Sequence, residues 1–342
     1  MSTNQTAISV RYIPEREAPY SSCNKLHGLA DRTPSLISHC IGENVQTSLQ
    51  LQQLLEGALS QSSKNAYQSD LRHFFSHGGT VPCSPEEAAE YVARLAGIHK
   101  TATIARRLVS IGKAHQLSGY DNPVKSDIVK LTMRGLRRSL GSAQRQAKPV
   151  LKEGLFVILE GMGEDLKSLR DKALLLLCFA GGFRRSEVVS LDVEDIEHVC
   201  EGIIVRLARS KTDQNGNGRK IAIPHGRGIW CPIRALKLWI SACGLQNGPL
   251  FRVVNRHGQM LPKRLSGQAV SIILKSRASS VGANCTNLSG HSLRAGFVTS
   301  AALAGVSSSS IRKQTGHRSD GMLNRYIRDT EMFKNNATAA IF

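Results

Sequence analysis

Apolar residues recur every three or four positions along much of the chain after residue 45, a spacing that is typical of amphipathic helices. The stretches that show this spacing are residues 49–77, 84–97, 101–119 and 125–141. The second stretch opens with Ser84, Pro85 and Glu87, a combination that predicts a capped helix start. We therefore predict a helical domain over residues 45–145.

The segments on either side of this domain show no sustained period. Residues 1–44 contain Pro14, Pro19 and Pro34 among serines and asparagines, and we predict a flexible N-terminal arm. The polar and basic run that follows the helical domain ends at Pro149, and we assign a linker to residues 146–150.

Residues 151–342 form a second predicted domain, in which helices alternate with a few strands. The predicted helices are residues 166–182, a further helix from residue 183 to 197, and residues 231–245 and 266–282. Two β-like runs, 202–212 and 219–224, flank a turn with Asn-Gly pairs and predict a hairpin. The fold class is therefore mainly α with a small β-sheet or hairpin.

The charge of the chain points to nucleic acid as a partner. Lys and Arg number 45 against 26 Asp and Glu, which gives a formal charge of +19 and a pI near 9.9. The excess is concentrated between residues 100 and 148, where only Asp121 and Asp127 oppose the basic side chains. The candidate DNA contacts, on polar faces of the predicted helices, are Arg106, Arg107, Arg134, Arg137 and Arg138. A solvated helix surface without DNA remains the alternative for this cluster.

Cysteine spacing and apolar run lengths exclude other classes of protein. The eight cysteines are scattered without a C-x-x-C pair, so we expect buried thiols in a reducing compartment and neither a metal site nor a cofactor. The longest apolar run, residues 173–183, is well below the roughly 20 residues that span a bilayer. We expect a cytoplasmic, nucleoid-associated protein with no membrane partner.

The candidate chemistry lies mainly in residues 288–329. His291 and Arg294 are one helical turn apart, and His317 and Tyr326 follow. Farther upstream, Arg184 precedes Glu187 by three residues, and Lys211 stands at the mouth of the predicted hairpin. A Tyr hydroxyl can hold a phosphate covalently, Arg offers paired donors to phosphate oxygens, and Lys or His can transfer the protons.

In this order and spacing the residues resemble the active-site boxes of the tyrosine recombinase (phage integrase) family, and the helical domain resembles that of its Cre- and Xer-type members. The resemblance implies a two-domain, C-shaped DNA clamp and no cofactor. It also implies a role for each residue: Tyr326 as nucleophile of a 3′-phosphotyrosyl bond, Arg184 and Arg294 as phosphate ligands, Lys211 as the acid for the leaving 5′-oxygen, His291 as general base, His317 as hydrogen-bond donor to the phosphate, and Glu187 as an orienting group. Lys220 and Arg185 remain alternatives to Lys211 and Arg184.

The implied function is site-specific recombination of double-stranded DNA at inverted-repeat sites through a Holliday junction. The synapse would be a homotetramer of a protein that is monomeric in solution, with the tail of each copy packed into its neighbour. A related recombinase or accessory protein stays open as a further partner, as does the choice between integration, resolution and inversion. The competing functions are a DNA relaxase of the type IB topoisomerase kind and a non-catalytic DNA-binding regulator.

Overall fold

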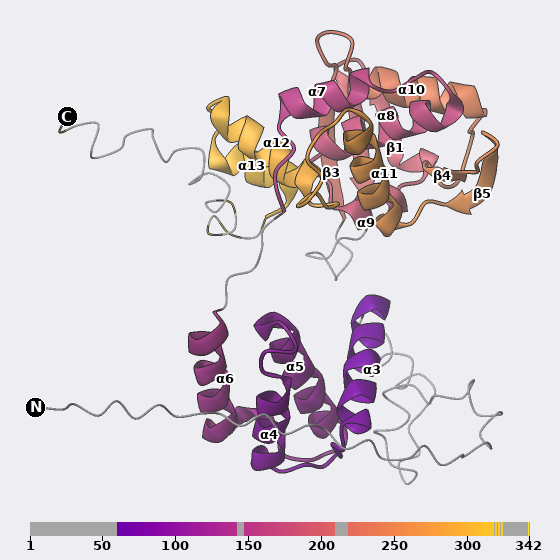
Figure 1. Cartoon of the computed structure of the whole chain (residues 1–342). Helices are drawn as coiled ribbons and strands as arrows, with labels where there is room; N and C mark the ends of the chain where they lie inside the picture. The colour runs from indigo at the N-terminus through magenta and orange to yellow at the C-terminus, as the bar shows by residue number, and fades with distance from the viewer. Residues whose placement is uncertain are drawn as a thin grey trace, which may run out of the picture. The chain divides into compact units, whose positions relative to one another are not determined.

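The computed structural model describes residues 60–141, 147–208 and 218–317, together with residues 319, 321, 323 and 341 (Figure 1). The chain divides into two compact units, Met1–Gln144 and Arg145–Phe342, and a separate hydrophobic core fills each of them. The predictions for the N-terminal arm, for Lys211 and for Tyr326 lie outside the described residues.

The first unit is a helical bundle. Its elements are α3 (Gln61–Ser76), α4 (Pro85–Leu95), α5 (Thr101–Leu117), the 3-10 turn η1 (Pro123–Lys125) and α6 (Asp127–Leu140). The predicted cap of α4 is confirmed, because the Ser84 amide donates to Glu87 Oε2 at 2.7 Å and the Glu87 amide donates to Ser84 Oγ at 3.1 Å. Contacts of α3 with α5 and of α4 with α6 bury Phe74 and Tyr91 in the core.

One basic residue of this bundle lies where the sequence did not place it. The prediction of a polar face is wrong for Arg107, which is 8% exposed and has its Nε 3.9 Å from buried Asp70 on α3. The side chain of Arg107 points inward because α5 packs against α3 at this position. Arg106 donates to Asp70 Oδ1 at 2.8 Å and remains about half exposed. The α6 arginines that were predicted to be exposed are exposed: Arg134, Arg137 and Arg138.

The second unit is built around α8 (Leu166–Ala180), which is buried along most of its length (Figure 1). Asp165 caps the start of α8 through its Oδ1, and Gly181 ends the helix as predicted. The helices that contact α8 are α9 (Arg185–Ser190), α10 (Pro232–Cys243), α11 (Gly267–Ser280) and α12 (Ser292–Leu303). The remaining helical elements are α7 (Lys152–Glu160), η2 (Val193–Asp195) and α13 (Ser308–Thr315), which packs on α12.

Two small antiparallel sheets complete this unit. The first has the order β1 (Ile196–Val199), β2 (Gly202–Leu207) and β3 (Arg219–Pro224), and the second pairs β4 (Arg252–Val254) with β5 (Met260–Arg264). The predicted pairing of the 202 and 219 runs is confirmed, with Leu207 opposite Arg219. The prediction of a helix through residue 197 is wrong, since α9 ends at Ser190 and the chain turns extended at Leu191. Mostly helical structure with small antiparallel sheets is the fold class that the sequence predicted.

The chain enters the second unit along α12. The Lys148 amide donates to Asn287 O at 3.1 Å, and the Val150 amide donates to Ser292 O at 3.0 Å. A Cβ at Gly296 would lie 1.7 Å from the Val150 carbonyl oxygen, so only glycine permits this approach. Residues 148–150, which we assigned to a linker, are therefore bound to the second unit.

Candidate active site

Arg184 is held by Glu187 at the start of α9. The Arg184 amide donates to Glu187 Oε2 at 2.9 Å, and its Nη1 donates to Glu187 Oε1 at 2.5 Å. Glu187 is 3% exposed and is thereby fixed against both the backbone and the side chain of Arg184. The turn before Arg184 uses Gly182 at φ +57°, where a Cβ would lie 2.8 Å from a methyl group of Thr315.

Arg294 connects α12 to this same turn. It is 5% exposed, its Nη1 donates to Gly182 O at 2.5 Å, and its Nη2 donates to His317 Nε2 at 3.2 Å. One guanidinium therefore contacts both the loop that precedes Arg184 and the ring of His317. His291 lies at the N-cap of α12 with an exposed side chain.

The contacts of His317 define which ring nitrogen carries the proton. A guanidinium can only donate, so Nε2 accepts from Arg294 and the proton of the neutral ring lies on Nδ1. Nδ1 then donates to Thr315 Oγ1 at 2.7 Å, and that hydroxyl donates to Ile311 O. Burial, followed by the cations Arg294, Arg184 and Arg219, lowers the pKa of His317 to about 4, so the ring is neutral at pH 7.

Arg219 is a member of this cluster that the sequence analysis missed. It lies on β3 with its Nη2 3.9 Å from Glu187 Oε2, and its Nη1 donates to Gln314 O at 3.2 Å. The alternation of burial along β3 places Arg219 on the same face as buried Ile221, and Lys220 on the exposed face. That alternation was visible in the sequence and is the signal that could have identified Arg219.

The structure thus brings four predicted residues together, namely Arg184, Glu187, Arg294 and His317. The alternative Arg185 is exposed and lies against Gly290 and Gly267 instead of Glu187. The alternative Lys220 belongs to the opposite face of β3. The guanidiniums of Arg184 and Arg219 face the Glu187 carboxylate, and that of Arg294 contacts His317 and the turn before Arg184. This concentration of paired donors suits a phosphate oxyanion.

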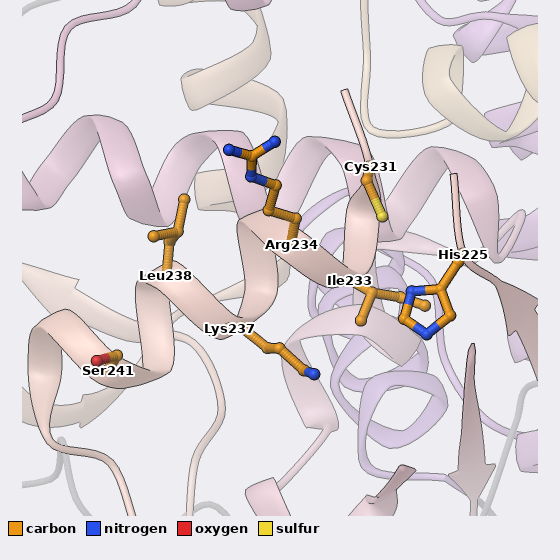
Figure 2. A pocket seen from close by; sticks show the side chains of 7 residues that line it. All are labelled: His225, Cys231, Ile233, Arg234, Lys237, Leu238 and Ser241. Carbon is orange, nitrogen blue, oxygen red and sulfur yellow. The ribbon is translucent and has the colours of Figure 1, made fainter. Parts of the chain in front are cut away.

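A separate surface pocket of about 350 Å³ lies along α10 (Figure 2). His225 and Cys231 line one end of it, and the other lining residues belong to α10: Ile233, Arg234, Lys237, Leu238 and Ser241. The described residues that line it include none of the predicted catalytic residues, so the pocket is distinct from the arginine cluster.

Comparison with known proteins agrees with the chemistry of the cluster. The model of the phage integrase family matches residues 153–332. The integrase/recombinase xerD homolog of Selenomonas ruminantium is 38% identical over 307 residues, which cover 87% of this chain and 90% of that protein. The chain belongs to the phage integrase family.

Other members of the phage integrase family resemble this tyrosine recombinase over both units. The recombinase Cre of Escherichia phage P1 is 26% identical over 73% of this chain and 77% of its own length. A lambda integrase tetramer bound to a Holliday junction superimposes with a TM-score of 0.58 at 16% identity, covering 80% of this chain and 74% of that one. The latter similarity shows that the fold is shared.

Proposed function

We propose that this tyrosine recombinase cleaves and rejoins double-stranded DNA at short inverted-repeat sites, through a 3′-phosphotyrosyl intermediate and a Holliday junction. The observation that carries the proposal is the buried cluster in which Glu187 holds Arg184, while Arg294 contacts both His317 and the turn before Arg184. Donors that are already fixed in place stabilise developing negative charge without reorganising during the reaction. A transferring phosphoryl group is where such an arrangement contributes most.

Each predicted catalytic residue has one role in the cleavage step. The Tyr326 oxygen attacks the scissile phosphorus, a new O–P bond forms, and the bond to the 5′-oxygen breaks. His291 accepts the tyrosine proton, and Lys211 supplies a proton to the departing 5′-oxygen. Arg184 and Arg294 hold the two non-bridging oxygens. The orientation of Lys220 away from Glu187 supports Lys211 as the acid, and the pairing of Arg184 with Glu187 supports Arg184 over Arg185.

His317 supports the phosphate in a way that depends on Arg294. Its Nε2 accepts from Arg294 in the structure, so it gains a donor toward DNA by taking up a second proton or by moving its proton from Nδ1 to Nε2. A bound phosphate carries negative charge and raises the pKa of a neighbouring histidine. The role of His317 as hydrogen-bond donor therefore belongs to the DNA-bound site.

We assign further DNA contacts to the first unit. Arg134, Arg137 and Arg138 are exposed on α6, and Arg106 is half exposed, so these four are our DNA-backbone contacts. Residues 45–145 would form the DNA-binding domain and residues 151–342 the catalytic domain. Arg107 is left out of the DNA contacts because it is buried beside Asp70.

The working form would be a homotetramer on two DNA sites, with the C-terminal tail of each copy packed into the next. The protein would act on nucleoid DNA in the cytoplasm. In the described ranges, no helix combines the length and the apolar character that a membrane span requires.

Covalent trapping tests this function. DNA fragments selected for binding would be nicked near the bound sequence and incubated with protein in EDTA, and the product would be analysed in SDS. We expect a covalent protein–DNA complex with the wild type and none with Tyr326→Phe, which should still bind. Binding without a covalent product at any nick position would favour the regulator. Relaxation of supercoiled DNA that lacks the selected site would favour the topoisomerase-like activity.

A further inference from the structure

Arg219 occupies a position between the two halves of the arginine cluster. On one side its Nη2 faces Glu187 Oε2 at 3.9 Å, and the other oxygen of that carboxylate holds the Arg184 side chain. On the other side its Nη1 donates to Gln314 O in the last turn of α13. The guanidinium therefore links the residue that orients Arg184 to the segment that leads into His317.

The turn before His317 is shaped around this guanidinium. Gly316 adopts a left-handed conformation at φ +69°, and a Cβ there would lie 2.2 Å from Arg219 Nη1. The Gln314 side chain adds two further contacts, donating to Ala180 O at 3.1 Å and to Ala222 O at 3.2 Å. The end of α8, strand β3 and the end of α13 are thus joined at one point beside Arg219.

These contacts close a ring that contains the predicted phosphate ligands. Arg184 contacts Glu187, which faces Arg219, and Arg219 contacts the α13 turn that carries His317. His317 accepts from Arg294, and Arg294 donates to Gly182, two residues before Arg184. Removing Arg219 would open this ring between its two arginine ligands.

Stability alone does not account for Arg219. Within the described part of the chain its buried Nε and Nη2 have no hydrogen-bond partner, and its closest carboxylate oxygen is 3.9 Å away. Burial lowers the pKa of this guanidinium, and Glu187 offsets the effect in part. Arg219 is 21% exposed, and a partly buried cation whose buried donors lack partners contributes less to folding than its charge would suggest. We therefore look for the contribution of Arg219 in the strand-cleavage reaction.

We propose that Arg219 is a positioning residue for strand cleavage, which sets the distance between Arg184 and His317 through Glu187 and the backbone of Gln314. The inference rests on the proposed strand-cleavage function. Arg219 does not touch the scissile phosphate in this role. It acts because small displacements of phosphate ligands lower the rate of a positioned reaction steeply.

The electrostatic field at His317 gives a second readout. The charged groups that face the ring are Arg294 from α12, Arg184 from the start of α9, and Arg219 from β3, and all three lower its pKa. Replacing Arg219 by methionine removes one of these cations, so the pKa of His317 rises from about 4 toward its ordinary value. A lysine at the same position keeps the charge and keeps the pKa low.

The test compares Arg219→Met, Arg219→Lys and Arg206→Met as full-length proteins. Arg206 on β2 is the matched control, because it lies opposite Lys220 in the same hairpin and pairs with Glu197 away from the cluster. We would measure the single-turnover rate of covalent complex formation on saturating nicked DNA, DNA affinity, and the titration of the His317 ring by NMR. His317→Gln would assign that ring signal.

Arg219→Met should form the covalent complex about 10- to 100-fold more slowly. DNA affinity should be unchanged, and the pKa of His317 should rise. Arg219→Lys should leave the pKa of His317 low yet restore the rate only in part, because one ammonium cannot reach both Glu187 and Gln314 O. Arg206→Met should match the wild type.

Wild-type cleavage by Arg219→Met would overturn the proposal, as would an equal loss of rate in Arg206→Met or a loss confined to DNA affinity. If Arg219→Met does not fold, a wild-type cleavage rate in Arg219→Lys would overturn it. Absence of any covalent complex with the wild-type protein would instead contradict the proposed function.

Discussion

His317 uses its two ring nitrogens for opposite purposes. Nε2 accepts from Arg294, while Nδ1 donates into a short chain that ends at the backbone of α13. The ring is thereby held neutral and oriented before any substrate is bound. We expect phosphate binding to draw Arg294 toward an oxygen, which exposes Nε2 to negative charge and favours its protonation. The histidine would then be a further cation beside the phosphate, in addition to Arg184 and Arg294, only when DNA is present.

The neutrality of His317 predicts a specific pH dependence of stability. The pKa of His317 is about 4 in the folded protein and near 6.5 in its ordinary state. Below pH 6.5 the unfolded chain takes up a proton that the folded chain does not, so this contribution to stability is complete above pH 6.5 and falls as the pH is lowered toward 4. His317→Gln should therefore show a smaller drop in Tm between pH 6.5 and pH 4 than the wild type.

Thermal unfolding at stepped pH values would measure this difference. His198→Gln is the matched control, because His198 on β1 is exposed and its loss should leave the wild-type slope unchanged. An identical slope in His317→Gln and the wild type would contradict a buried, neutral ring.

Sequence motifs predicted four residues of the cluster, and only for Arg184 and Glu187 did the spacing itself show the contact. Arg184 and Glu187 are three residues apart, and the cap geometry of a short helix brings them together. Alternation along β3 could have marked Arg219 as an inward-facing residue, but not its contact with Glu187, which depends on the register of β3 against β2 and on the fold of α13. Arg107 shows the converse: its neighbour Arg106 is about half exposed, yet Arg107 is buried beside Asp70, which lies on another helix.

Among the elements of the second unit, α8 and α11 are joined by a buried charge network. Asp171 on α8 is 1% exposed and accepts from Arg170 Nε at 2.9 Å through Oδ1 and from Arg277 Nε at 2.8 Å through Oδ2. The period of an amphipathic helix identified α8, but it could not show that a carboxylate on the buried face is matched from α11. The short strands β1, β4 and β5 were missed for a related reason: each is five residues or fewer and partly exposed, so the apolar alternation is weak.

Removing the carboxylate from this network should destabilise the second unit. Asp171→Ala leaves two buried or partly buried guanidiniums without their partner, which typically lowers the free energy of unfolding by about 3 to 5 kcal/mol. Denaturant unfolding followed by circular dichroism would measure the change. Glu197→Gln, which disrupts the exposed pair with Arg206, should change it by no more than about 1 kcal/mol. Equal changes in the free energy of unfolding for the two substitutions would show that the buried network stabilises the protein no more than the exposed pair.

Over the whole chain, the formal charge of +19 is distributed between two units with separate cores. The two units use their arginines differently. In the second unit Arg184 and Arg219 are turned toward Glu187 and Arg294 toward Gly182 and His317, whereas the arginines of α6 face solvent. Outward-facing arginines can release counterions from DNA over a broad surface, so affinity and catalysis should respond to different substitutions.

Replacing Arg134, Arg137 and Arg138 together by glutamine should weaken DNA binding at all sequences. The slope of log affinity against log salt should become shallower by about 2 to 3, roughly one for each phosphate that is no longer neutralised. Fluorescence anisotropy over a range of salt concentrations would measure this slope. Lys237→Gln on α10 is the control and should leave the slope unchanged. A slope that is unaltered in the triple variant would remove α6 from the DNA-binding surface.

The contacts of residues 148–150 with the second unit determine where DNA-binding domains can be exchanged between recombinases. The amides of this segment are bound to Asn287 and Ser292, and its Val150 oxygen lies against Gly296, two residues after Arg294. If the DNA-binding domain of another recombinase were joined after residue 150, residues 148–150 would be replaced. These residues lie against α12, the helix that carries Arg294. A junction placed before residue 148 would transfer DNA binding and keep the native contacts of residues 148–150 with α12. Backbone contacts within the second unit thus set the boundary for engineering a new target preference. The junction should lie after Gln144, where the two units divide, and before Lys148, whose amide is the first to bind the second unit.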